Sequence, residues 1–300
     1  MAQRTTRDQT ESNTATAGTG VRWTKQTKAF ALRNLRAMLR TKATIIWGFG
    51  FPAFWYILTS LFFLPDAGDV GAATLADTKG ATAVSLGLFG VLTVTLVAFA
   101  SGLGEDLTAK RYRKLRSLPV APSADFAGRY LAGVAVAAVS YALVLAVGWV
   151  DGASYTLRQP SSVLVVVGSF LLFALVGTSV AVLVIWLVED AEIVVGITNA
   201  ILLVSYFLTG YNGLVPGLLP GDSRWLVNVA PNSLAARLQA WHLTDLPKTV
   251  PAGTREAGLS PPSLPVSPAF VTLLAAWAVV LGVAAAVLMD RAVYSGEGGE

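Results

Sequence analysis

Long apolar blocks dominate this sequence and restrict the folds that are open to it. Each is about 20 residues long, the length at which a helix that rises 1.5 Å per residue crosses the ~30 Å hydrocarbon core of a bilayer. Of the 300 residues, 54% are hydrophobic and 13% are charged, whereas a soluble domain typically has roughly 25% charged residues. We therefore expect an all-α integral membrane protein.

The apolar blocks predict the positions of six transmembrane helices and of a short tail that follows them. The six spans are residues 43–64, 82–104, 125–150, 163–188, 193–210 and 269–289. The fifth is close to the minimum length for a span. The first contains Pro52, whose missing N–H predicts a kink. Residues 43–290 thus form one six-span domain, and residues 291–300 form a tail.

Two segments precede the first span. Residues 1–21 are rich in Thr, Ser, Gly and Gln, which predicts a disordered tail. Residues 22–42 have a helical period that puts an apolar face (Trp23, Phe30, Ala31, Leu35 and Met38) opposite a basic face (Lys25, Lys28, Arg33, Arg36 and Arg40). We expect an interfacial helix with its apolar face in the cytoplasmic headgroup layer; a plain solvated helix is the alternative.

Basic residues predict the orientation of the chain. With both termini in the cytoplasm, 16 Lys and Arg residues lie on the cytoplasmic side and six lie outside, in agreement with the positive-inside rule. The acidic turn at residues 189–192 is then cytoplasmic and opposes this bias, although acidic residues weigh little in the rule. We see no removable signal peptide before the first span.

A long segment, residues 211–268, would lie outside between the fifth and sixth spans and contains nine of the 14 prolines. In residues 211–243 the apolar residues recur at near-helical spacing, which predicts short re-entrant-like helices that dip into the outer interface. Residues 244–268 are rich in Pro and irregular, which predicts a surface loop.

Motifs for chemistry are absent from the sequence. There is no cysteine, and His242 is the single histidine. No HExxH, GxSxG or paired-carboxylate motif accompanies it, and the phosphate-binding GxxxxGK[ST] loop is missing. No basic tract interleaved with aromatic residues predicts nucleic-acid binding. We expect no catalytic, cofactor-binding or metal-binding residue here, so that any ATP hydrolysis belongs to another chain.

The segment at residues 105–124 is the most informative part of the cytoplasmic side. It begins with Glu105 and Asp106, continues as a short basic helix with Tyr112, Leu115 and Leu118 as apolar points, and meets Pro119. A short charged helix of this kind suits docking of a soluble partner. A solvated loop that only satisfies the positive-inside rule is the alternative.

The order of these features resembles the ABC type-2 exporter permeases. The resemblance rests on the amphipathic helix, the proline-bearing first span, L-R-S-L-P-V-A-P at residues 115–122, Leu208-Thr209-Gly210, G-L-V-P-G-L-L-P at 213–220 and V-A-P-N-S-L at 229–234. It extends over residues 22–290. It implies a multi-pass permease in the plasma membrane of a prokaryote.

The same resemblance implies the partners and the functional segments. Two permeases, identical or different, would pair in the membrane lipid, and two copies of a separate ABC ATP-binding subunit would supply ATP hydrolysis. The implied ATPase-coupling residues are Asp106, Lys110, Arg111, Tyr112, Leu115 and Leu118. Members often have Glu-x-Glu-x-Gly-Thr before this helix, whereas here Asp106 is followed by Leu-Thr-Ala.

The first, second and fifth spans would face the dimer axis and line the pathway. The polar residues of the fifth span are Asn199, Ser205 and Thr209, and hydrogen bonding between helices is an equal alternative for each. The apolar spans favour amphiphilic cargo and leave polysaccharide open. A membrane-embedded enzyme, or a membrane anchor subunit of another complex, is the alternative function.

Overall fold

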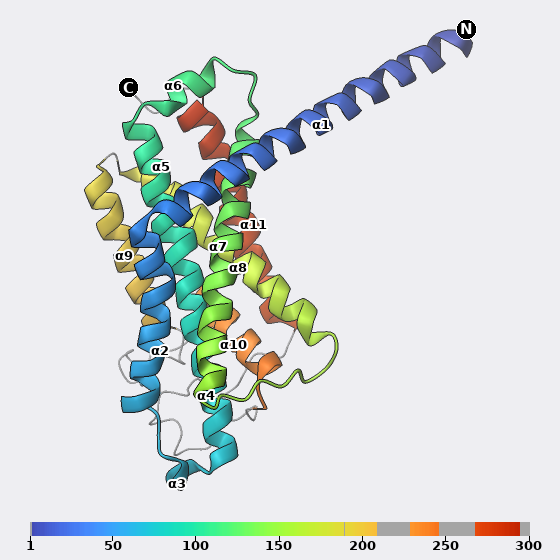
Figure 1. The fold of residues 1–300 in the computed structure, drawn as a ribbon. Coiled ribbons are helices and arrows are strands. Elements are labelled where there is room, and N and C mark those ends of the chain that lie inside the picture. The colour runs from blue at the N-terminus through green and yellow to red at the C-terminus, as the bar shows by residue number, and fades with distance from the viewer. Residues whose placement is uncertain (1, 189, 209–228, 246–267, 295–300) are drawn as a thin grey trace.

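The computed structural model describes residues 2–188, 190–208, 229–245 and 268–294, and in this part of the chain helices are the only regular structure (Figure 1). The prediction of an all-α membrane protein is confirmed. Five stretches among these residues are long and apolar enough to cross a membrane: Thr44–Phe62, Ala72–Thr108, Pro122–Val150, Ser162–Leu187 and Pro268–Arg291. The predicted span at 193–210 corresponds to helix α9 (Ala191–Leu208), whose apolar part, Glu192–Tyr206, is shorter. The count of six spans stays a prediction.

The second membrane stretch forms the centre of the bundle. It consists of α4 (Ala72–Leu92), a π-helical segment η2 (Thr93–Ala98) and α5 (Phe99–Thr108). Its most apolar part is 89% buried, compared with 17% for the last stretch. Gly87 permits close packing, because a Cβ there would lie 2.7 Å from the ring of Tyr141. The helix begins ten residues before the predicted start at residue 82, and charged side chains in this first part have partners on neighbouring segments.

The first membrane stretch is joined to helix α7 (Pro122–Val150) by a hydrogen bond one turn before Pro52. It consists of a π-helical segment η1 (Thr44–Gly50) and α2 (Phe51–Phe62). In an α-helix the N–H of residue 52 would bond to the carbonyl of Gly48, and proline lacks that N–H. The hydroxyl of Ser140, on α7 (Pro122–Val150), donates to this carbonyl instead. The disturbance predicted at Pro52 is therefore a π-helical segment whose freed carbonyl is bonded across to α7.

Helix α1 (Ala2–Arg40) lies across one end of the bundle (Figure 1). It includes the segment that the sequence predicted to be a disordered tail, and no proline interrupts it. Phe30 is 8% exposed, and a Cβ on Gly128 of α7 would lie 2.5 Å from the Cβ of Phe30. The apolar face that we expected in the lipid headgroups therefore packs against α7, because Gly128 lets the two backbones approach closely.

The remaining helices of the described residues are of two kinds. The long ones are α8 (Ser162–Leu187) and α11 (Pro268–Leu288), and the short ones are α3 (Ala67–Val70), α6 (Arg111–Arg116), α10 (Pro231–Leu243) and η6 (Met289–Tyr294). Residues 232–240 of α10 are all buried, and α10 packs against α8 and α4. It is one short helix in the segment where the sequence predicted several. The rest of that segment lies outside the described residues, and re-entry into the bilayer stays a prediction.

Candidate functional site at the basic end

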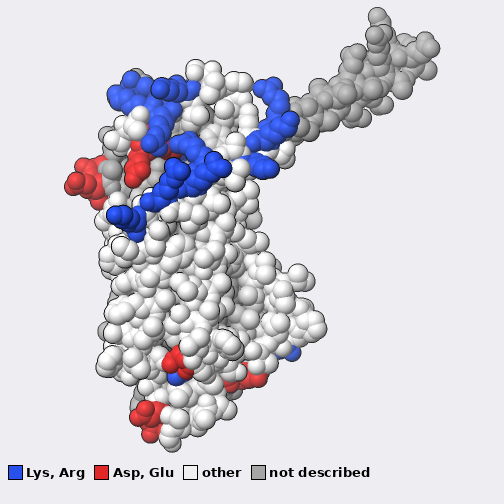
Figure 2. All heavy atoms as spheres, viewed as in Figure 1, with Lys and Arg blue, Asp and Glu red and all other residues white. Residues whose placement is uncertain are grey.

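Basic side chains gather at one end of the molecule, over α1 and α6 (Figure 2). We call this the basic end. The middle of the molecule shows almost no charged side chains in this view, and a few acidic and basic ones lie at the opposite end, near α3. An uncharged band between two charged ends is the pattern expected of a protein that crosses a bilayer, since charges in the hydrocarbon are costly.

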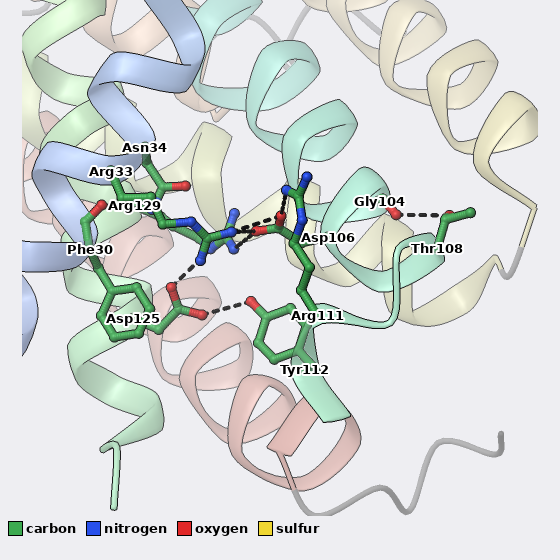
Figure 3. A network of polar contacts seen from close by, with 10 residues as sticks. All are labelled: Phe30, Arg33, Asn34, Gly104, Asp106, Thr108, Arg111, Tyr112, Asp125 and Arg129. Atoms are coloured by element: carbon green, nitrogen blue, oxygen red, sulfur yellow. Dashed lines mark hydrogen bonds and ion pairs between the residues drawn. The ribbon is translucent and has the colours of Figure 1, made fainter. Parts of the chain in front are cut away.

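Asp106, in the last turn of α5, collects three arginines at the basic end (Figure 3). Nη2 of Arg33 on α1 lies 2.9 Å from Oδ1 and 2.8 Å from Oδ2 of Asp106. Arg111 of α6 and Arg129 of α7 donate to the same carboxylate. Asp106 is only 3% exposed. One buried carboxylate therefore joins four helices.

A second buried carboxylate, Asp125 in the first turn of α7, extends this network. It accepts from Nε of Arg129 at 3.1 Å and from the hydroxyl of Tyr112 on α6 at 2.6 Å. Asp125 is fully buried and Arg129 is 4% exposed. Because buried charges are costly unless they are paired, Arg129 depends on both carboxylates. We call Arg33, Asp106, Arg111, Tyr112, Asp125 and Arg129 the basic-end network.

The turn between α5 and α6 places α6 beside this network. Lys110 has a φ of 54°, in the left-handed region that few non-glycine residues adopt, and its N–H donates to the carbonyl of Leu107 at 2.8 Å. Tyr112 is buried and Leu115 packs partly against the core. Lys110 and Leu118 are exposed, and the Arg111 side chain is 54% exposed.

The structure thus separates the predicted coupling residues, of which Leu115 packs partly against the core. Asp106, Arg111 and Tyr112 come together in the network, whereas Lys110 and Leu118 face outward. From the sequence, Asp125 and Arg129 were only part of the predicted span at residues 125–150, and Arg33 lay on the basic face of residues 22–42. Their i,i+4 spacing was the available signal for the pair on α7, whereas nothing local pointed to Arg33.

Helix α1 is also bonded to the chain that follows α6. The side-chain amide of Gln26 donates to the carbonyl of Pro119 at 2.8 Å, and its oxygen accepts from the N–H of Ala121 at 3.1 Å. Nε1 of Trp23 donates to the hydroxyl of Ser123 at 3.0 Å. Together with Arg33, these bonds make α1, α6 and the start of α7 one connected unit.

The predicted pathway residues lie elsewhere, on α9. Asn199 is exposed and donates to the carbonyl of Val195 in its own helix at 2.8 Å. The carbonyl of Ser205 accepts from the amide of Asn232 on α10. Thr209 lies outside the described residues. A small pocket between α4, α8, α9 and α10 is lined by Leu88, Phe89, Leu92, Phe173, Leu202, Ser205, Tyr206 and Asn232.

His242 and the rest of the described residues offer no cluster for metal binding. Nδ1 of His242 lies 2.8 Å from the hydroxyl of Ser162. Within residues 2–188, 190–208, 229–245 and 268–294, no three His, Cys, Asp or Glu side chains are grouped so that they could hold an ion.

Comparison with known proteins identifies the family. A search of individual curated proteins returned no match. The family model described as "ABC-2 type transporter" matches residues 25–238, more than half of the chain. The match includes the whole basic-end network, from α1 through α7. This chain belongs to the ABC-2 type transporter family, as one of its multi-pass membrane permeases.

Proposed function

We propose that this permease is the membrane subunit of an ATP-driven exporter. It would work as a dimer, with separate ATP-binding subunits docked at its basic end. The basic-end network carries the proposal, because it joins α6, the exposed segment suited to docking, to the helix at the centre of the bundle. Family membership supports a transporter permease; the docking, the dimer and the direction of transport are our proposal.

The bonds of α6 determine where a force on it would go. Arg111 of α6 contacts Asp106, which lies in the last turn of the continuous stretch from Ala72 to Thr108. Tyr112 of α6 contacts Asp125, at the start of the third membrane stretch. A displacement of α6 would therefore move the central helix and α7 together. ATP binding to the docked subunits would favour one of two permease conformations by binding it more tightly.

Charge supports placing the basic end in the cytoplasm. Most Lys and Arg residues of the chain fall in α1 and in the segment from Lys110 to Arg129, and such a bias marks cytoplasmic segments. ATP is available on that side. This chain would bind no ATP itself, and hydrolysis would occur in the partner.

The docking proposal is tested by placing a charge on the exposed surface after α6. Leu118 is 54% exposed, so Leu118→Asp leaves the core intact and puts a carboxylate in the proposed contact. Leu157, at the opposite end, is 51% exposed and provides the matched control, Leu157→Asp. Leu115 is less suitable because it packs against the core.

We expect Leu118→Asp to lose co-purification with the ATP-binding subunit and Leu157→Asp to retain it, at equal amounts of permease in the membrane. Vesicle transport that requires ATP should fall in the same pattern. Equal co-purification of the two variants would contradict docking at α6. ATP hydrolysis by the purified permease alone would contradict the assignment of the ATPase to a partner.

A further inference from the structure

The exposed face of α1 combines leucines with basic side chains. Leu32 is 42% exposed and Leu39 is 48% exposed, and their spacing of seven residues puts them on one side of the helix. Lys25, Lys28, Arg36 and Arg40 are exposed around them. This side is opposite the one that packs on α7, where Phe30 is buried.

The basic residues of this face are available for an external partner. Lys25, Lys28, Arg36 and Arg40 form no ion pair with any residue of the described part of the chain. Arg33 differs, since it contacts Asp106. Figure 2 shows the basic side chains as a stripe on α1 where that helix lies across the bundle.

The exposed leucines continue onto the surface of the first membrane stretch. Helix α1 ends at Arg40, and η1 begins at Thr44 with Ile45, Ile46 and Trp47 at 47%, 59% and 56% exposure. Exposed apolar side chains thus occur on α1 and again at the start of the first membrane stretch.

We propose that this face of α1 binds anionic phospholipid headgroups of the cytoplasmic leaflet. Leu32 and Leu39 would enter the boundary between headgroups and acyl chains, and the basic side chains would contact lipid phosphates, as in other basic amphipathic helices. The inference rests on the cytoplasmic orientation proposed above, but not on ATP-driven export. Because Arg33 and Arg111 share Asp106, bound lipid would also hold the docking segment in place.

Counting bound lipids tests the proposal. The purified permease would be extracted from bilayers of equal phosphatidylglycerol and phosphatidylcholine, and retained lipids counted by native mass spectrometry. Lys25→Gln/Lys28→Gln removes two charges from α1. Lys110→Gln/Lys114→Gln removes two identical charges from the region of α6 and is the matched control, since all four lysines are exposed.

We expect the wild type and the α6 control to retain phosphatidylglycerol in preference to phosphatidylcholine. The α1 variant should lose that preference by roughly tenfold, as each basic residue near the surface contributes to binding of anionic lipid. Equal preference in both variants, or no preference in the wild type, would overturn the proposal. The proposal would also be overturned if the α1 variant kept the lipid preference of the wild type but no longer co-purified with the ATP-binding subunit. That result would show that this face of α1 binds a protein partner. Leu118→Asp should keep the lipid preference, which separates this test from that of docking.

Discussion

At each end of this permease an aspartate gathers several partners, Asp106 at the basic end and Asp151 at the opposite end, but the partners of the two aspartates differ. At the basic end, three arginines bond to Asp106, whose side chain is 4% exposed. At the opposite end, Asp151 follows α7 and its side chain is 31% exposed. It accepts from the hydroxyls of Tyr56 and Ser60 and lies 3.1 Å from Nζ of Lys79.

This difference predicts that the two ends lose different amounts of stability when their carboxylate is removed. Removing one member of a buried charge network leaves the remaining charges unpaired, which is strongly destabilising. The donors at the partly exposed Asp151 are two hydroxyls and one lysine, and water can replace the lost bonds there, so the loss is smaller. Burial alone would raise the pKa of Asp151, but the hydrogen bonds from Ser60, Lys79 and Tyr56 hold it below its usual value. We therefore expect the loss of Asp151 to lower the free energy of unfolding slightly and the loss of Asp106 to lower it strongly.

The largest effect is expected from Asp106→Asn. Arg129 is 4% exposed and would keep only Asp125 as a charged partner, and Arg33 and Arg111 would lose theirs. Breaking a buried charge network costs about 3–5 kcal/mol. Unfolding by heat or denaturant in detergent would measure the loss.

Glu105→Gln is the control for this variant. Glu105 is the neighbouring residue, it is exposed, and it forms no ion pair among the described residues. A destabilisation of Asp106→Asn no greater than that of Glu105→Gln would remove the distinction between the two ends.

The sequence predicted part of this site and missed the rest for a physical reason. Asp106, Arg111 and Tyr112 lie together in the segment between two spans, so their position along the chain was informative. Arg33 lies 73 residues before Asp106, and their pairing requires α1 to pack closely on α7, where Gly128 leaves no room for a Cβ. Such contacts depend on tertiary packing, which no local pattern records.

The sequence predicted the parts of the fold that depend on hydrophobicity. It did not predict the parts that depend on contacts between distant side chains. Apolar blocks located the membrane stretches, because burial in lipid depends on composition. The central helix begins ten residues before the predicted span, since Lys79 contacts Asp151 and Asp77 accepts from the N–H of Asp245. The charged residues that precede the predicted span are therefore satisfied within the protein. The π-helical segments η1 and η2 likewise left no signal beyond Pro52.

The second largest effect is expected from Gly128→Ala, which tests how α1 reaches the network. The new methyl group would meet Phe30 at 2.5 Å and the carbonyl of Thr27 at 2.8 Å, so α1 must move. Overpacking of this kind costs about 1–3 kcal/mol, and thermal unfolding would measure it. Gly102→Ala, on α5 at the same end, meets nothing within 4 Å and should be neutral or stabilising. If both substitutions were neutral, close packing of α1 on α7 would be contradicted.

A smaller loss is expected from Asp151→Asn at the opposite end. The variant weakens bonds to Tyr56, Ser60 and Lys79, each worth about 1 kcal/mol or less at a partly exposed site. We expect a total of about 1–2 kcal/mol by the same reasoning, measured by the same unfolding experiment. Asp69→Asn, exposed on α3 at this end, is the control. A loss as large as that of Asp106→Asn would show that the two carboxylates are equivalent.

The smallest effect is expected from His242, which lies at the opposite end. Its protonation should make the melting temperature depend on pH. Burial lowers the pKa of His242, and the charge of Arg158 lowers it further. The unfolded chain therefore takes up the proton first, near pH 6.5, and stability falls as the pH drops below that value toward the lower folded pKa. We expect the melting temperature of the wild type to decrease more between pH 7.5 and pH 5 than that of His242→Gln, which cannot titrate in this range. The slope should be unchanged in Glu105→Gln at the basic end. Parallel curves for the wild type and His242→Gln would show that protonation of this histidine does not oppose folding.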